Sequence, residues 1–351
     1  MSNFAKAKNI LFLSIAVFSL VVVLTANKNT VNTSKQAAMS FLNPKVTLAS
    51  ATAPTQTQTI QLYTGWNYIS FNIEPLDQNG NPIYSVKDVL MSINGQYAAV
   101  QSFDRGAKSY YPDLPESMND LKTMLPQFGY SIKVPQNVVL TINGKQTKAN
   151  QPISLQAGWN NIGYLPNMAI NTKFALYSIR DKYEKIYTFN PKDGAKVYYN
   201  DLPWSFNDLT CMRPGQGYWI KMKEAAALIY PLTGNCSATL PTSDSYYQDT
   251  NGITMSNFWA DFVIDTAFKI RLKTGDVIEA VDNNNIVCGR AVINKLTKTV
   301  QIHVYGDDAT TPADEGAKND EPITFRLNGN TISLTGYSVW NEQAYRTLTV
   351  N

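Results

Sequence analysis

The sequence predicts a mainly β protein: two tandem homologous β-rich modules with short helices, followed by a β-sandwich domain. Three observations support this fold class. The stretch "GAKSYYPDLPESMNDL" at positions 106–121 recurs as "GAKVYYNDLPWSFNDL" at positions 194–209, 88 residues later. Apolar and polar residues alternate in short runs, as they do in half-buried strands. Clusters of Gly, Asn and Asp separate these runs at regular spacing, which is typical of all-β folds.

The chain of 351 residues opens with a segment typical of export. Lys6 and Lys8 precede an uncharged, largely apolar run from Ile10 to Ala26. A basic start, an apolar centre and a small residue at the end indicate a signal peptide over residues 1–26. The run is also just long enough to cross a bilayer, so an uncleaved membrane anchor is the alternative. Residues 27–57, rich in Thr, Ser, Ala and Gln, are expected to form a flexible linker.

Two repeated modules are predicted over residues 58–146 and 147–233, because matched stretches run through both. Each opens with Gly-Trp-Asn and closes with a related strand, "GYSIKV" in the first and "GYWIKM" in the second. Alternation places Ser131 of the first strand and Trp219 of the second on the outer face. Residues 85–93 carry apolar side chains at helical spacing, so we expect one short helix per module. The Asn143-Gly144 pair predicts a tight turn between strands.

The rest of the chain is predicted to be a linker, residues 234–250, and a β-sandwich, residues 251–351, with strands at regular spacing. The three cysteines, Cys211, Cys236 and Cys288, show no CxxC pair. In an exported protein one disulfide is expected to leave one thiol over, and Cys236–Cys288 is the favoured pair. A chain with no disulfide fits the same spacing.

The charge of the chain excludes a strong electrostatic pull onto nucleic acid. The formal net charge is +3, from 30 basic and 27 acidic residues, and it falls to +1 without Lys6 and Lys8. A protein near neutrality lacks the basic excess that phosphate backbones attract. We therefore expect no nucleic-acid partner, and membrane contact only through an uncleaved N-terminal segment.

An acidic loop between two predicted strands is the candidate metal site. Asp307, Asp308, Asp314 and Glu315 crowd into nine positions, and like charges at that density repel unless a cation compensates them. Calcium accepts six to eight oxygen ligands, which such a loop supplies from carboxylates and carbonyls. The spacing is not that of an EF-hand. The sequence thus predicts Ca²⁺ as a cofactor of the last domain, and a solvated acidic turn is the alternative.

Two tryptophans of the second module are the candidate ligand-binding residues. Trp204 and Trp219 stand where the first module has Glu116 and Ser131, so both positions tolerate water in one copy. Exposed aromatic rings there would form a platform for a sugar ring or a partner surface. The alternative is that they pack against the first module or the last domain. Aromatic residues kept in both copies, such as Trp66 and Trp159, are expected to lie in the core.

No catalytic constellation stands out in the sequence. The single histidine, His303, alternates with apolar neighbours on a predicted strand, and we expect a surface residue there rather than a general base. The paired carboxylates Asp201 and Asp208 recur in the first copy as Asp113 and Asp120, and two duplicated active sites are not expected. Asp113 and Asp201 lie in an Asp-Leu-Pro turn and are predicted to cap it. Phosphate-binding and dinucleotide-binding motifs are absent from the sequence. We therefore expect a protein that is not an enzyme.

The chain resembles modules of secreted, multi-domain bacterial surface proteins. The C-terminal residues that carry this resemblance are "FWADF", "GDVIEAVD", "CGR", "VYGDD", "DEGA" and "ITFRLNG", within residues 251–335. The duplicated part is similar to "GWN…GYWIK" repeats of exported proteins. Residues 283–285 and the stretch after Cys288 depart from the usual pattern. The resemblance implies a surface location and a β-sandwich architecture.

These observations together predict an exported, cell-surface or extracellular binding or adhesion protein, non-catalytic, with a calcium-stabilised last domain. Its expected partner is a surface glycan or a protein. Two alternatives stay open. One is a structural subunit that self-assembles through the linker or a sheet edge. The other is an accessory carbohydrate-binding protein that serves an enzyme encoded elsewhere.

Overall fold

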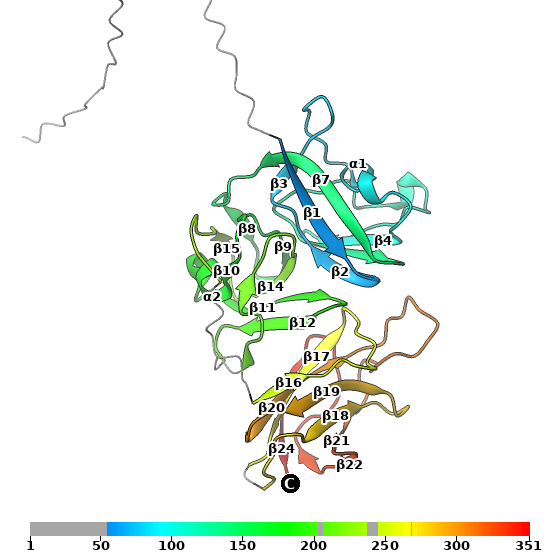
Figure 1. Cartoon of the computed structure of the whole chain (residues 1–351), viewed down its shortest axis with the longest axis vertical. Helices are drawn as coiled ribbons and strands as arrows, with labels where there is room; N and C mark the ends of the chain where they lie inside the picture. The colour runs from blue at the N-terminus through cyan, green and yellow to red at the C-terminus, as the bar shows by residue number, and fades with distance from the viewer. Residues whose placement is uncertain (1–54, 203–205, 237–244, 268) are drawn as a thin grey trace, which may run out of the picture. The chain divides into compact units, whose positions relative to one another are not determined.

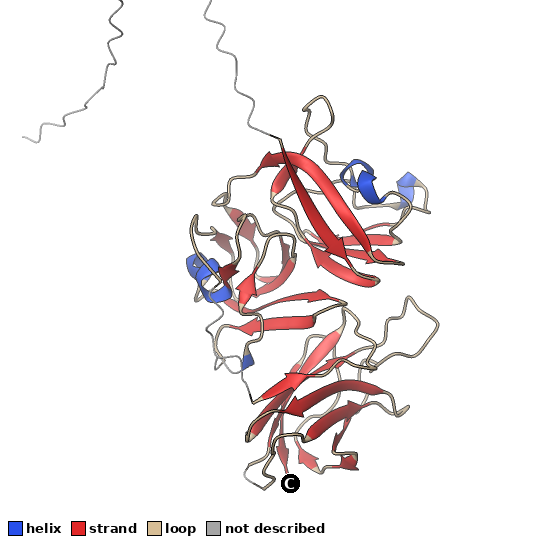
Figure 2. Cartoon of the chain, viewed as in Figure 1, coloured by secondary structure: helices blue, strands red, loops and turns tan. Residues whose placement is uncertain are grey.

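The computed structural model describes residues 55–202, 206–236, 245–267 and 269–351 (Figure 1). The predicted signal peptide, most of the first linker and Trp204 lie outside the described residues. The described part is mainly β, as predicted, with short helical turns between the strands (Figure 2). No helix within it is long and apolar enough to cross a membrane.

The first module, called module 1 below, consists of two sheets around one apolar core that includes Leu62, Phe71 and Ile132. The three-stranded sheet has the order β1 (Gln56–Leu62), β7 (Val138–Gln146), β3 (Ile73–Pro75). The four-stranded sheet has the order β2 (Gly65–Ile69), β6 (Tyr130–Val134), β4 (Ala99–Phe103), β5 (Ala107–Tyr110). The helical turns are α1 (Val86–Val89), η1 (Met91–Ile93) and η2 (Glu116–Met118). The predicted helix is therefore present, and the Ser85 side chain caps it by accepting from the Asp88 N–H.

The second module, module 2 below, repeats this architecture with its own core. Its four-stranded sheet has the order β9 (Gly158–Ile162), β14 (Tyr218–Met222), β11 (Tyr183–Asn190), β12 (Gly194–Tyr199), which matches β2-β6-β4-β5 strand for strand. The remaining pairs are β8 (Ile153–Leu155) with β15 (Ala226–Leu228), and β10 (Ile170–Asn171) with β13 (Cys211–Met212). The helical turns are α2 (Thr172–Ala175) and η3 (Tyr177–Ile179).

The turn predicted at Asn143-Gly144 is wrong, because both residues lie inside the long strand β7. Gly144 pairs with Gln56 of β1 on one side and with Pro75 of β3 on the other. A Cβ atom at Gly144 would lie 2.0 Å from the Glu74 carbonyl oxygen. The glycine is thus needed for close approach of a neighbouring strand, and not for a turn.

The C-terminal domain is a β-sandwich whose two sheets enclose a core that includes Phe262, Ile302 and Phe325. One sheet has the order β16 (Tyr246–Gln248), β19 (Val287–Ile293), β18 (Val277–Val281), β21 (Thr324–Leu327), β22 (Asn330–Thr331). The other has the order β20 (Thr299–Tyr305), β17 (Trp259–Asp265), β24 (Tyr345–Val350), β23 (Leu334–Thr335). All pairs are antiparallel except β17 with β24.

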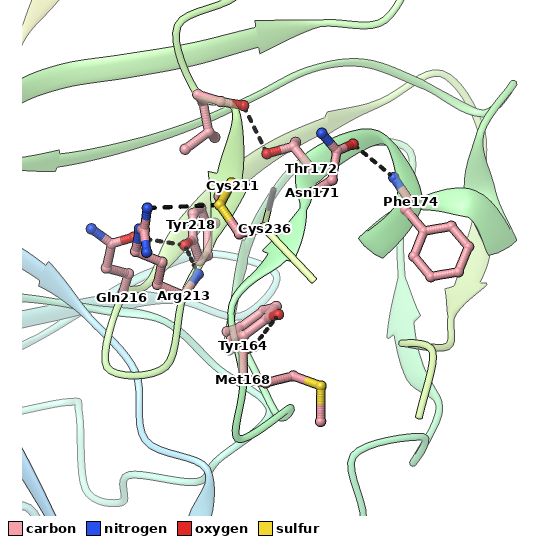
Figure 3. The surroundings of a disulfide bond; sticks show 11 residues. Tyr164, Met168, Asn171, Thr172, Phe174, Cys211, Arg213, Gln216, Tyr218 and Cys236 are labelled. Carbon is pink, nitrogen blue, oxygen red and sulfur yellow. Dashed lines mark hydrogen bonds between the residues drawn. A yellow bond between two sulfur atoms is a disulfide. The ribbon is translucent and has the colours of Figure 1, made fainter. Parts of the chain in front are cut away.

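The favoured disulfide, Cys236–Cys288, is wrong: Cys211 is bonded to Cys236, with 5.8 Å between their Cα atoms (Figure 3). The bond closes module 2, where the Asn171 N–H also donates to the Asn235 carbonyl. Cys288 is a free, buried thiol in the core of the C-terminal domain, and burial raises its pKa to about 12. Spacing along the chain could not show that Cys236 is bonded within module 2 whereas Cys288 lies in the core of the C-terminal domain.

Candidate functional site

The outer faces of both four-stranded sheets pack with the C-terminal domain in one apolar cluster. Alternation turns Tyr218, Ile220 and Met222 of β14 inward and leaves Trp219 outward, as predicted. The same alternation holds in module 1. The buried members of the shared cluster are Trp66, Tyr68, Ala99, Tyr187, Phe189, Ala195, Val197, Tyr199, Ile253, Trp259 and Tyr305. The three parts are thus joined by a core of their own.

A cleft of about 340 Å³ opens beside this cluster, and we call it the aromatic cleft. Its volume lies at the lower end of the range of small-ligand sites. It is lined by all three parts: Tyr68, Gln101, Ser102, Ala107, Lys108, Ser109, Tyr111 and Ser131 from module 1, Trp159, Tyr187 and Trp219 from module 2, and Asn257, Phe258, Glu342 and Gln343 from the C-terminal domain.

Trp219, one of the two predicted ligand-binding residues, is half-buried in this cleft. Its ring lies 5.6 Å from that of Phe103 in module 1, centroid to centroid. It is also edge-to-face with Trp159 at 6.4 Å and stacked on Tyr187 at 6.5 Å. Trp219 therefore packs partly against module 1, as the alternative interpretation held, and still lines a space that a ligand can enter.

Two pairs of equivalent positions at which the copies differ meet in this cleft. Gln101 pairs with Ser131 across β4 and β6, and at the equivalent place Tyr187 pairs with Trp219 across β11 and β14. All four residues line the cleft. At this pair of positions module 1 contributes small polar side chains and module 2 contributes aromatic rings, a combination common in sites for small polar ligands.

Three polar atoms of cleft residues are buried without a hydrogen-bond partner. They are the Trp219 Nε1 donor, the Gln343 Nε2 donor and the Asn257 Oδ1 acceptor. Asn257 as a whole is only 6% exposed. A buried polar group without a partner costs about 1–3 kcal/mol, so three of them around one cleft are unusual in a native fold. The arrangement can hold a ligand that offers both acceptors and a donor.

In the acidic loop, each of the four predicted metal-ligating residues contacts a different residue of the protein. Asp307 accepts the Glu315 N–H at 3.1 Å, and Asp308 binds Lys133 of module 1 at 3.1 Å. Asp314 binds Lys318 at 3.0 Å, while Glu315 accepts from the Thr311 hydroxyl. Within residues 55–351, where described, no group of three or more His, Cys, Asp or Glu side chains could hold a metal ion. One Glu315 oxygen is buried without a partner, a feature that fits a cation, and calcium binding stays a prediction.

His303 is not a surface residue: it is 2% exposed and lies between two carboxylates. Its Nδ1 is 2.5 Å from Asp261 of the same domain, and its Nε2 is 3.1 Å from Asp208 of module 2. Burial opposes the charged ring, but Asp261 and Asp208 together raise the pKa of His303 to about 9. The prediction failed because the outer face of β20 is covered by module 2, which a single strand's pattern cannot show.

The two carboxylates beside His303, Asp208 and Asp261, also form hydrogen bonds to other residues of module 2. Asp208 accepts the Val197 N–H at 2.7 Å with one oxygen, the role that Asp120 plays for Ser109 in module 1. Its other oxygen serves His303 and, at 3.6 Å, Lys196. Asp261 also accepts from the Tyr199 hydroxyl. Asp208 thus keeps the backbone contact of its counterpart Asp120 and gains a second partner, His303, in module 2.

The chemistry of this cluster is that of a buried ion network rather than of a general base. An imidazole with a pKa near 9 and both nitrogens facing carboxylates is protonated at neutral pH, so it has no lone pair with which to take a proton. Both donors are already used within the protein.

Comparison of the chain with family models, curated proteins and solved structures finds no match. The resemblance to bacterial surface modules therefore stays a prediction. Among the cleft residues, Trp219 was foreseen from its contrast with Ser131, whereas Asn257 and Gln343 carry no sequence signal that marks them. Trp204 lies outside the described residues.

Proposed function

We propose that this chain is an exported surface or extracellular protein that binds a surface glycan or a protein partner in the aromatic cleft, without catalysing a reaction. The carrying observation is Trp219: a half-buried indole beside Trp159 and Tyr187, with a shielded N–H that no protein group accepts. Aromatic rings with one apolar face and one polar handle are favoured at binding sites. Export rests on the N-terminal segment, residues 1–26.

The test is binding of the fluorescently labelled full chain to bacterial and host cell surfaces. Replacing Trp219 with Ala removes the ring, and binding is expected to fall at least tenfold, as it does when a central aromatic anchor is truncated. Trp219→Phe keeps one aromatic ring and removes the N–H together with the rest of the indole, so a smaller loss than in Trp219→Ala is expected. Tyr177→Ala is the control, because this ring is 57% exposed and lies outside the cleft.

Unchanged binding by Trp219→Ala, in a protein whose melting temperature is unchanged, would show that the ligand does not enter this cleft. A full chain that binds no surface but grows in mass with concentration in light scattering would favour the self-assembling subunit instead.

A further inference from the structure

We propose that Gln343 and Asn257 recognise the ligand of the aromatic cleft by hydrogen bonds and that this ligand is a neutral saccharide unit. The inference rests on the proposed function, because it concerns the same cleft.

Gln343 has a left-handed backbone conformation, with φ of 61°. Non-glycine residues avoid this region, and Asn or Asp are the usual exceptions because their short side chains bond locally. Of the four other non-glycine residues described as left-handed in the C-terminal domain, three are Asn or Asp, and Ala267 is a second exception. Asn285 accepts from Arg326, Asp320 accepts from Asn341, and Asn328 accepts the Val277 N–H. Gln343 is neither Asn nor Asp, and its side-chain nitrogen bonds to nothing.

The strained backbone is held firmly from both sides. The Gln343 N–H donates to the Trp259 carbonyl at 2.7 Å, and its own carbonyl accepts from Lys185 of module 2 at 2.7 Å. Glycine would satisfy both bonds without strain, since neither uses a side chain. A strained backbone is usually retained for a function when the side chain has no structural role. The Gln343 side chain has no hydrogen-bond partner for its nitrogen and lines the aromatic cleft, which suggests a role in binding there.

The hydrogen-bonding groups of the cleft match a hydroxyl-rich ring. Trp219 and Gln343 each offer an unused donor and Asn257 an unused acceptor, whereas a sugar hydroxyl donates once and accepts twice. In the present conformation all three atoms are shielded from water, so binding requires the Gln343 and Asn257 amides and the Trp219 ring to shift toward the ligand. The rings of Trp159, Tyr187 and Trp219 supply apolar surface for the C–H face of the sugar.

The charges that line the cleft favour a neutral ligand. Lys108 and Glu342 are the charged residues among those that line it, one of each sign. An acidic sugar would lack the cluster of cations that carboxylates and phosphates require. A peptide that adds a strand beside β5 is the competing ligand, because residues 107–109 line the cleft, and the experiment separates the two.

The experiment uses the full chain on an array of immobilised glucose, galactose, mannose and N-acetylglucosamine oligomers, with uronic-acid oligomers alongside. Binding to a neutral oligomer is expected, and calorimetry with that oligomer then measures the variants. Gln343→Gly is expected to weaken binding about tenfold, while its melting temperature stays equal or rises because the strain is relieved. Asn257→Ala tests the acceptor in the same way and is likewise expected to bind more weakly.

Asn285→Gly is the matched control: it relieves the same backbone conformation at an exposed residue away from the cleft, so binding should not change. The proposal is overturned if Gln343→Gly and Asn257→Ala bind as wild type while Trp219→Ala does not. It is also overturned if the chain binds only uronic-acid oligomers or no oligomer. A chain that binds no oligomer yet loses cell-surface binding in Trp219→Ala would retain the proposed function with a peptide ligand.

Discussion

The buried His303 predicts a specific pH dependence of stability that its removal should abolish. The pKa of His303 is raised from 6.5 to about 9 by Asp261 and Asp208, against the opposing effect of burial. One pKa unit corresponds to 1.36 kcal/mol, so the charged ring stabilises the folded state by about 3 kcal/mol. Because the folded pKa lies above the unfolded one, this stabilisation is full below about pH 6.5. It is lost as the pH rises through about 9.

The magnitude is taken from the histidine alone. Asp208 is the other partner of this ion pair, but its side chain is 34% exposed, so solvent screens its charge and no separate stabilisation is added for it. Removing one partner of a buried ion pair typically costs 3–5 kcal/mol, which agrees in scale. We thus expect His303→Gln to unfold about 3 kcal/mol more easily than wild type at pH 6.

The assay is urea unfolding followed by tryptophan fluorescence between pH 6 and 9.5. Burial lowers the pKa of Lys185 to about 8, so its contribution changes in the opposite direction above that pH. The difference between wild type and variant removes this contribution, and it should shrink toward zero as the pH rises through 9. In Tyr199→Phe, which loses the hydroxyl bonded to Asp261, the difference should stay constant over this range, because burial keeps this tyrosine neutral.

A His303→Gln difference that is the same at pH 6 and pH 9.5 would refute the reasoning. Such a result would mean that the ring contributes packing rather than charge. A difference below 1 kcal/mol at pH 6 would show that the two carboxylates are solvated without it, and hence that module 2 does not cover β20 in solution.

Two further predictions concern the disulfide and the acidic loop. Reduction of Cys211–Cys236, which are 25 residues apart in the sequence, should destabilise module 2 by about 3 kcal/mol. Differential scanning calorimetry with and without reductant should show a lower melting temperature on reduction in Cys288→Ala but not in Cys211→Ala. An effect of reductant on Cys211→Ala would contradict the pairing. If Asp307, Asp308, Asp314 and Glu315 bind calcium, the melting temperature should be higher in calcium than in chelator, and this difference should be smaller in Asp307→Asn. Equal melting temperatures would show that Lys133 and Lys318 remain the partners of Asp308 and Asp314.

Strand positions and faces were predictable because alternation is a local property. The period of two in residues 130–134 and 218–222 is set by which side chains meet the module's own core, and both copies have the same core. Residues kept in both copies often belong to the shared module core, as Tyr130 and Tyr218 do, although Trp66 and Trp159 lie in the cluster between the parts instead. The short helix over residues 85–93 followed from the same local pattern.

The errors concern contacts between segments distant in the sequence. The sequence Asn143-Gly144 predicts a turn, yet Gly144 is needed because the backbone of Glu74 passes too close for a side chain. His303 reads as exposed because its strand face looks polar, but Asp208 and Tyr199 arrive from module 2. The sequence offers Cys288 as a disulfide candidate, but in the structure it is buried in the core of the C-terminal domain. No local pattern encodes such approaches.

The candidate site was half predictable for the same reason. Comparing the copies identified Ser131 and Trp219 as positions free of the module's core, which is a local inference. Asn257 and Gln343 become notable only through an unpaired amide and a left-handed backbone held by Trp259 and Lys185. These properties exist only once module 2 and the C-terminal domain are in contact.

Duplication itself explains how such a cleft can arise. Two identical outer faces would both be polar and would not pack, or both be aromatic and would close on one another. Divergence at equivalent positions, Gln101 and Ser131 against Tyr187 and Trp219, leaves small polar side chains on one face and aromatic rings on the other where both faces border the cleft. Because the inner faces carry the fold of each module, the outer faces could change without loss of either core. The cleft is therefore lined by residues that differ between the copies, such as Ser131 and Trp219, together with residues that both copies keep, such as Tyr111 and Trp159.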